Sequence, residues 1–360
     1  MISFARGVPA PECLPVAELA DCARTVLERD GETALNYGPA AGYGPLREWL
    51  AERHGVSPAE ILVLNGSLQG LDLLLGRYGS ERRVLVEAPT YDRVLHAAAR
   101  RGLDIGAVPH DEEGIDPDAL ERELARDRRP ALLYLLPTFQ NPSGRTISVE
   151  RRRRVLELAE AHGTVVVEDD PYRLVRFDGE DVASLHELPG GERVVYSSSL
   201  SKIVAPGLRV GYLVAPAGLA SELERAAAST YLAPAFSTQA IAFEFLRRGL
   251  LEANVERVRG LLRLRRDAML AALERELPDA AWNVPAGGYF LWLELPDGLG
   301  ARDVLSSASE AGVTFVPGDD FFLSPHEDSG AARLAFSFAS PEEIGEGVAR
   351  LAGVCFRAAV

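Results

Sequence analysis

TVVVEDDPY at residues 164–172 and VVYSSSLSK at residues 194–202 share one pattern: a short run rich in β-branched residues ends in polar side chains. Such a run is typical of a strand that is buried on both faces of a sheet. Similar apolar runs occur along the first two thirds of the chain, at 61–64, 83–87, 131–136 and 208–214. These residues therefore predict the strands of one central sheet.

Segments with helical periodicity, such as 116–127 and 149–162, separate these runs. The first of them opens with Asp116 and Pro117, residue types that are favoured at a helix N-cap and in its first turn. Strands that alternate with helices are typical of a mostly parallel sheet whose crossover helices cover both faces. We therefore predict an α/β fold with a large three-layer α/β/α domain.

The C-terminal part of the chain follows another pattern. An arginine-rich helical segment at about 251–277 precedes a helical segment at 301–311 and strand-like runs at 287–295, 313–317 and 333–338. This order predicts a smaller α+β C-terminal domain. We expect three parts: an N-terminal arm that packs with the small domain and the functional site, a large domain and a small domain, at residues 1–30, 31–250 and 251–360.

The charge balance limits the possible partners. The 360 residues include 53 acidic and 38 basic side chains, a formal charge of −15. Binding to nucleic acid needs clustered cations, so we expect no such partner. No apolar run reaches the roughly 20 residues that span a bilayer, and the first residues lack a secretory pattern, so we expect a cytoplasmic protein without membrane contact. Cys13, Cys22 and Cys355 lack metal-ligand spacing, and we expect no metal.

Lys202 is the only lysine among the 38 basic residues. A compositional bias toward arginine explains the other 37, because both residue types serve as solvated charges. An arginine stays protonated, whereas a lysine amine can be desolvated, lose its proton and attack a carbonyl carbon. Lys202 is therefore either a lysine that the bias left in place by chance or the residue that forms a Schiff base. The residues around it have to distinguish these two alternatives.

The ends of the predicted strands supply these surroundings, because ligands of open α/β sheets bind beyond the carboxyl ends of the strands. After the strand at 61–64, the free N–H groups of Gly66, Ser67 and Leu68 open a helix and suit an anion such as phosphate. Five further candidates follow other strands or begin the next one: Tyr91, Asn141, Asp169, Lys202 and Arg209.

Each candidate alone has an ordinary explanation. The turn at Ser67 fits a capped helix, Tyr91 fits simple packing, and Asn141 fits a turn residue that binds its own backbone. Together they form one set, because five strand ends would have to imitate a single site independently. An amine, an anion cradle, an aromatic ring and a carboxylate for a pyridine nitrogen indicate pyridoxal 5'-phosphate. A substrate carboxylate also needs an arginine, for which Arg333 is the candidate.

The chain resembles a known family, the fold-type I, class I and II pyridoxal phosphate aminotransferases. The motifs that carry the resemblance are NPSG (141–144), DDPY (169–172), SLSK (199–202) with Arg209, and RLAFSF (333–338). Four more segments are similar to the subgroup of 2-aminoadipate and kynurenine aminotransferases: ISFARGVPAPECLP (2–15), NYGPAAGYGPLREWLA (36–51), GGYFLWLEL (287–295) and VPGDDFF (316–322). The resemblance covers nearly the full length.

The resemblance implies a role for each matching residue. Lys202 would form the aldimine with the cofactor and then act as the base, Asp169 would pair with the pyridine nitrogen, and Tyr91 would stack on the ring. Asn141 and Tyr172 would donate to the ring 3-oxygen.

The resemblance also implies how the remaining groups are bound. Ser67, Ser199 and Arg209 would hold the phosphate with the N–H groups of residues 66–68, and Tyr37 would reach it from the neighbouring subunit. Arg333 and Asn141 would bind the substrate carboxylate. The protein would then be an obligate homodimer with shared active sites.

Three positions depart from the subgroup pattern. Arg6 replaces a glycine in an arm that can cover the substrate, so it is either a contact for a polar substrate side chain or a solvated arm residue. Leu68 replaces a common glutamine, which leaves only its backbone for binding. Tyr289 replaces a usual methionine and is expected to narrow the substrate pocket.

These features predict a transaminase that moves an amino group from an L-amino acid to a 2-keto acid, such as 2-oxoglutarate or pyruvate, by a ping-pong mechanism. An enzyme that performs elimination, cyclisation or oxidation on an amino acid with the same cofactor is the alternative. A third hypothesis is a ligand-sensing regulator. We expect this least, because no DNA-binding domain precedes residue 1 and the chain is acidic.

Overall fold

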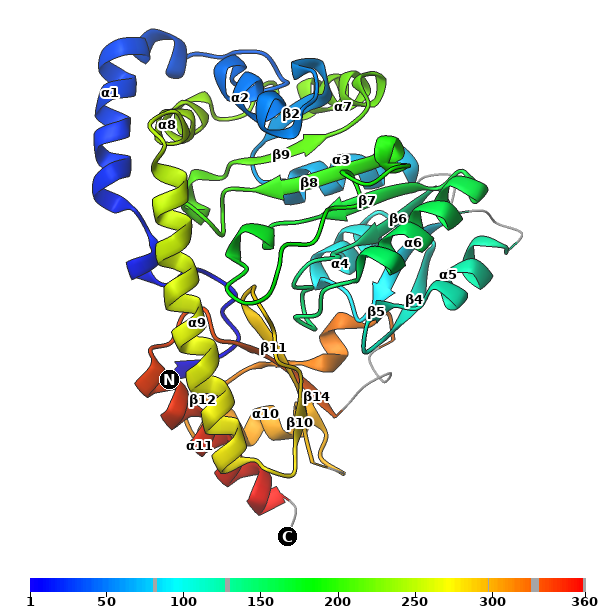
Figure 1. The fold of residues 1–360 in the computed structure, drawn as a ribbon, viewed down its shortest axis with the longest axis vertical. Helices are drawn as coiled ribbons and strands as arrows, with labels where there is room; N and C mark the ends of the chain where they lie inside the picture. The colour runs from blue at the N-terminus through cyan, green and yellow to red at the C-terminus, as the bar shows by residue number, and fades with distance from the viewer. Residues whose placement is uncertain (80–82, 127–129, 297, 325–329, 359–360) are drawn as a thin grey trace.

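The computed structural model describes residues 1–79, 83–126, 130–296, 298–324 and 330–358. A large α/β part and a smaller part with its own sheet lie one above the other (Figure 1). Helix α9 (Leu250–Glu276) runs along one side of the molecule, and the N-terminus lies beside the small part (Figure 1). The predicted division of the chain at residues 30 and 250 stays a prediction.

The central sheet has eight strands in the order β2-β9-β8-β7-β6-β3-β4-β5. Neighbours among β3, β4, β6, β7 and β8 pair in parallel, whereas β9 is antiparallel to both β2 and β8. All six runs that were predicted as strands form strands of this sheet: β2 (Ile61–Leu64), β3 (Val84–Ala88), β6 (Leu132–Leu135), β7 (Val165–Asp169), β8 (Val194–Ser199) and β9 (Gly211–Val214).

Sequence reasoning missed the strands at one edge of this sheet, β4 (Ile105–Asp111) and β5 (Gly114–Ile115). Strand β4 is only partly buried and contains Pro109, His110 and Asp111, so it lacks the continuous apolar run of the central strands. Strand β9 begins later than predicted because Arg209 has a left-handed backbone (φ 53°), which a strand cannot continue.

Helices cover both faces of the sheet, as the three-layer prediction requires. Helices α3 (Ser67–Tyr78), α4 (Asp92–Arg100) and α7 (Ala217–Tyr231) pack on the face of Val84 and Val86. Helices α5 (Pro117–Leu124) and α6 (Val149–His162) pack on the opposite face, that of Leu85. The Asp116 side chain accepts a hydrogen bond from the N–H of residue 118, which confirms the predicted N-cap, and Asp127 lies outside the described residues.

The small part contains an antiparallel sheet in the order β10-β11-β14-β13, with helices α10 (Ala301–Glu310) and α11 (Pro341–Ala358). The run predicted at 313–317 divides into β12 (Val313–Thr314) and β13 (Val316–Pro317), because the two pair with different strands. The other strands of this sheet are β10 (Ala281–Trp282), β11 (Phe290–Glu294) and β14 (Ala331–Ala335).

The N-terminal segment connects the two parts. Strand β1 (Ile2–Ser3) pairs in parallel with β12 of the small part, and α1 (Val16–Ala34) packs against α8 (Phe236–Arg247) of the large part. Helix α2 (Gly44–His54) follows and also contacts α8. Within the described ranges, no helix combines the length and the apolar character needed to cross a bilayer.

Candidate active site

A cavity of about 590 Å³ lies where the carboxyl ends of the central strands meet the arm and the small part. Ala5, Gly7 and Val8 of the arm line it, as do Phe290 and Phe321 of the small part. Ten residues that were predicted for the site also line this cavity: Ser67, Leu68, Tyr91, Asn141, Asp169, Tyr172, Ser199, Lys202, Arg209 and Arg333.

Lys202 follows β8 and lies in this cavity with its amine pointing at the arm. Its Nζ donates a hydrogen bond of 2.7 Å to the carbonyl oxygen of Gly7. Burial, with a further contribution from the Arg333 charge, lowers the pKa of Lys202 to about 8. The amine therefore loses its proton more readily than a surface lysine, as a nucleophile requires.

Asp169, the last residue of β7, is buried on the same face as Tyr134 of β6. Its Oδ2 accepts a hydrogen bond of 2.7 Å from the Tyr134 hydroxyl, while its Oδ1 is buried and has no hydrogen-bond partner in the part of the chain that the structure describes. Burial raises the pKa of Asp169 to about 6. An unsatisfied buried carboxylate oxygen is costly, so this position suits a cationic donor that the protein itself does not supply.

Sequence reasoning missed Tyr134, because it looked for polar residues only after the strands. Tyr134 is a fully buried residue inside β6, where a phenol has to find a hydrogen-bond partner. The signal that was available is the single polar atom within the apolar run 131–136.

The turn at Gly66 forms a tight anion cradle with Arg209. Gly66 has φ +94°, and a Cβ atom there would lie 2.2 Å from Nη2 of Arg209. A Cβ atom on Gly211 would lie 2.2 Å from the backbone nitrogen of Ser67, so β9 passes directly against the start of α3. Free N–H groups at a helix start and an adjacent guanidinium are the donors that a phosphate group requires.

Arg333 and Asn141 lie together although 192 residues separate them in sequence. Nη1 of Arg333 donates to Oδ1 of Asn141 over 2.8 Å, and Nη2 donates to the carbonyl oxygen of Ala5 over 3.0 Å. The Arg333 guanidinium is buried against the ring of Phe290, and burial lowers its pKa to about 10. Its Nε has no hydrogen-bond partner among the residues described. No carboxylate of the described residues pairs with it, so it can bind the carboxylate of a ligand.

The remaining cavity residues include two tyrosines. Tyr172 is buried, with its ring centroid 5.8 Å from Nζ of Lys202. Burial raises the pKa of Tyr91 to about 12, so this phenol stays protonated. Ser199 is buried, and its Oγ accepts a hydrogen bond from the backbone N–H of Ser201.

Four predicted residues do not line the cavity: Gly66, whose neighbours Ser67 and Leu68 do line it, and Arg6, Tyr289 and Tyr37. Arg6 is exposed, and its guanidinium lies 4.4 Å from the ring centroid of Phe338, because the arm presents its Gly7 backbone to the cavity instead. Tyr289 is fully buried, and its hydroxyl donates to the carbonyl oxygen of Lys202 over 2.8 Å. Neither residue lines the cavity, although the ring centroid of Tyr289 lies 5.2 Å from Nζ of Lys202, and their expected contacts with a substrate stay predictions.

Tyr37 has no contact with this cavity either. Its side chain is 80% exposed on the segment between α1 and α2. Exposure is compatible with the expected contribution to a neighbouring subunit, which stays a prediction.

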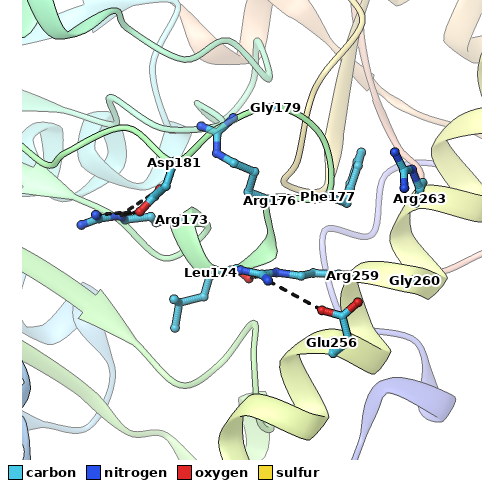
Figure 2. A pocket seen from close by; sticks show the side chains of 10 residues that line it. All are labelled: Arg173, Leu174, Arg176, Phe177, Gly179, Asp181, Glu256, Arg259, Gly260 and Arg263. Carbon is cyan, nitrogen blue, oxygen red and sulfur yellow. Dashed lines mark hydrogen bonds and ion pairs between the residues drawn. The ribbon is translucent and has the colours of Figure 1, made fainter.

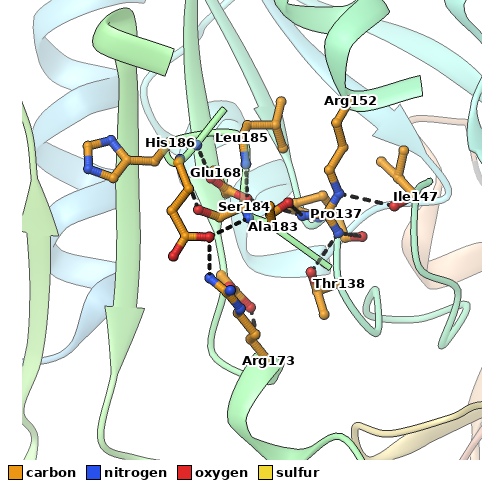
Figure 3. Close-up of polar contacts among 12 residues, drawn as sticks. Pro137, Thr138, Ile147, Arg152, Glu168, Arg173, Ala183, Ser184, Leu185 and His186 are labelled. Atoms are coloured by element: carbon orange, nitrogen blue, oxygen red, sulfur yellow. Dashed lines mark hydrogen bonds and ion pairs between the residues drawn. The ribbon is translucent and has the colours of Figure 1, made fainter. Parts of the chain in front are cut away.

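A buried polar network supports the site from the opposite face of the sheet (Figure 3). Arg152 of α6 is fully buried and donates to the carbonyl oxygens of Pro137 and Ile147, which flank the turn of Asn141. Its Nη1 also lies 3.6 Å from Oε1 of Glu168. This network, which sequence reasoning missed, fixes the turn of Asn141 relative to the strand of Asp169.

Comparison with known proteins identifies the family. The family model described as aminotransferase class I and II matches residues 2–351. The chain belongs to this family. It is 42% identical to a 2-aminoadipate transaminase of Thermus thermophilus over 98% of this chain and 89% of that protein. It is 38% identical to an aromatic-amino-acid aminotransferase of Thermococcus litoralis, over 98% of this chain and 87% of the relative.

A solved structure has the same fold. The structure of α-aminoadipate aminotransferase from Thermus thermophilus, in complex with N-(5'-phosphopyridoxyl)-L-leucine, has a TM-score of 0.95 and 40% identity. The match covers 100% of this chain and 94% of that chain. The protein is therefore a fold-type I aminotransferase that depends on pyridoxal phosphate, and the predicted fold class, enzyme class and cofactor are confirmed.

The described residues fit this cofactor. The unpartnered Oδ1 of Asp169 suits the protonated ring nitrogen, and the cradle of Gly66, Ser67 and Arg209 suits the phosphate. The amine of Lys202 lies in the same cavity. When bound, pyridoxal phosphate supplies an aldehyde for a Schiff base and a ring that accepts the electrons released at the substrate Cα.

Proposed function

We propose that the residues of this cavity carry out transamination in the roles that the sequence predicted. Lys202 would hold the cofactor through its amine, and it holds or returns the proton that leaves the substrate Cα, because its lowered pKa lets the amine do both near neutral pH. Asp169 keeps the ring nitrogen protonated. Arg333 binds the substrate carboxylate, and Asn141 orients the guanidinium through their 2.8 Å hydrogen bond.

One observation carries this proposal. A single cavity holds the amine of Lys202, a buried oxygen of Asp169 without a hydrogen-bond partner and the buried guanidinium of Arg333, which pairs with no carboxylate among the described residues. A cofactor with a bound amino acid would supply one partner to each group. It would offer an aldehyde carbon to the amine, a ring N–H to the carboxylate oxygen and a carboxylate to the guanidinium. Two aromatic side chains, Tyr91 and Phe290, line the same space.

The names of the relatives suggest which donors to test first. The relatives named above act on 2-aminoadipate and on aromatic amino acids, so both classes belong in a screen, with 2-oxoglutarate and pyruvate as acceptors. Each donor is added alone to the cofactor-loaded protein, and the absorbance change to the amine form of the cofactor is followed. Stoichiometric conversion supports a ping-pong transaminase. Turnover of the donor with the aldehyde form restored would instead support elimination, cyclisation or oxidation.

We also propose a homodimer in which Tyr37 completes the phosphate site of the partner. The 80% exposure of this side chain, on a segment beside the large part, supports the proposal. Light scattering gives the mass in solution, and Tyr37→Phe should weaken cofactor binding in a dimer. A monomer with normal cofactor affinity would contradict it. The cytoplasmic location stays a prediction.

A further inference from the structure

A second cavity, of about 430 Å³, lies between the segment that follows Tyr172 and helix α9 (Figure 2). It shares no lining residue with the cavity of Lys202. Four arginines line it, Arg173 and Arg176 from that segment and Arg259 and Arg263 from α9. Among the lining residues, Asp181 and Glu256 are acidic, and Glu187 and Asp178 pair with two of the arginines from outside the lining.

Ion pairs inside the protein compensate these four arginines unequally. Arg173 is well compensated, because it contacts Asp181 and Glu187 at 2.8 Å each. Arg263 pairs with Asp178. Arg259 lies 3.7 Å from Glu256, whose side chain is 78% exposed, so solvent weakens this pair.

Arg176 has no carboxylate partner among the described residues. Its guanidinium lies 4.6 Å from the ring centroid of Phe139, and its Nε and Nη2 are buried without hydrogen-bond partners. Its Nη1 makes one long contact, 3.4 Å, with the carbonyl oxygen of Asp178. Burial lowers the pKa of Arg176, and the nearby Asp181 charge opposes this shift only in part. A partly buried charge of this kind gains free energy when an anion binds nearby.

Hydrogen bonds to the backbone hold the two segments that line this cavity in place. Nε of Arg259 donates to the carbonyl oxygen of Leu174 over 2.8 Å, which ties α9 to the segment of Arg173 and Arg176. Arg176 itself pairs through its backbone with Gly287 in an isolated β-bridge. The arginines are therefore presented from positions that are fixed before a ligand arrives, which reduces the entropy cost of binding.

We propose that this arginine cavity binds a small multivalent anion with phosphate or carboxylate groups. Guanidinium groups recognise both chemistries, because their paired N–H donors match two oxygens of one group. Arg176 and Arg259 are the main contacts, since the protein compensates their charges least. This site is independent of the proposed catalytic roles.

Isothermal titration calorimetry on the cofactor-loaded protein tests this inference, because the phosphate cradle is then filled. Pyrophosphate and citrate represent the two chemistries, and sodium acetate is the monovalent control. We expect one saturable site per chain for at least one of the two multivalent anions, with weaker binding at higher salt. Arg176→Gln and Arg259→Gln should each weaken it about tenfold or more, as expected for a lost charge-assisted contact.

Arg153→Gln is the matched control. It removes the same charge from an exposed position of α6 outside the cavity and should leave the affinity unchanged. Circular dichroism checks the fold, and Arg259→Gln provides the test if Arg176→Gln does not fold. The proposal is overturned if neither anion binds, if both cavity variants bind as the wild type does, or if only Arg333→Gln abolishes binding, which would place the anion in the Lys202 cavity. None of these binding results tests transaminase activity, so this proposal can fail while the proposed function stands.

Discussion

Glu168 and Asp169 are neighbours in β7, and both carboxylates are fully or almost fully buried, yet the protein treats them differently. Glu168 accepts hydrogen bonds from the backbone N–H groups of Leu185 and His186 and lies near Arg152. Asp169 keeps one oxygen without a partner on the opposite face. Consecutive residues of a strand point to opposite faces of the sheet. The Glu168 carboxylate therefore contributes to the stability of the fold, whereas the Asp169 carboxylate is available to a ligand.

This comparison predicts opposite effects for substitutions on the two faces. Changes on the Asp169 face should reduce activity and leave stability almost unchanged. Changes on the Glu168 face should reduce stability first.

Lys202→Ala should have the largest effect, because Lys202 provides both the covalent link and the proton transfer on the Asp169 face. We expect turnover to fall by about 10⁴-fold or more. Lys202→Arg is the control that keeps the charge and should be equally inactive. Mass spectrometry after borohydride reduction checks the link: a cofactor still attached to the peptide of residue 202 in either variant, or near-normal turnover, would refute the assignment.

Asp169→Asn should lower turnover by about 10²-fold or more, because a neutral amide cannot hold the ring nitrogen protonated as well as a carboxylate does. The amide can still accept the Tyr134 hydrogen bond, so the urea midpoint of unfolding should change little. Steady-state kinetics and urea unfolding on the same preparation check both statements. A large loss of stability with normal turnover would reverse the comparison.

Glu168→Gln should lower the free energy of unfolding by about 1–3 kcal/mol. The amide nitrogen of glutamine cannot accept a hydrogen bond, so one of the two backbone N–H groups that Glu168 binds loses its partner. Turnover should fall much less than in Asp169→Asn. Glu160→Gln, on the exposed surface of α6, is the control and should change stability by less than about 0.5 kcal/mol. Equal stability of the Glu168 variant and this control would show that the network of Figure 3 contributes little to the free energy of unfolding.

The last expected effect is a difference in pH dependence. Burial raises the pKa of Glu168 to about 7 from an ordinary value of 4.5. The folded state therefore binds more protons than the unfolded state between these values, and the stability from Glu168 falls as pH rises through this window. The free-energy difference between wild type and Glu168→Gln should shrink from pH 4.5 to pH 7, with a slope of at most about 1.4 kcal/mol per pH unit. A constant difference across chemical unfolding curves in this range would contradict the raised pKa.

Much of this protein could be predicted from patterns along the chain. Continuous apolar runs identified the six strands around the site, since strands buried on both faces have little choice of residue type. The half-buried edge strand β4 lacked that signal and was missed. Ten of the predicted site residues line one cavity, most of them because parallel strands bring their carboxyl ends to one edge of the central sheet. Arg333 instead comes from β14 of the small part.

The sequence by itself determined the chemistry, through its single lysine and the motifs that follow the strands. Only the tertiary structure decided where long side chains point: Arg6 lies on Phe338, and Tyr289 lies behind Lys202. It alone also brings Arg176 beside α9, some 80 residues later in the chain, and leaves one oxygen of Asp169 unpaired. The physical reason is that strand periodicity fixes which face a residue occupies, whereas partners and counter-ions depend on packing between segments that are distant in sequence.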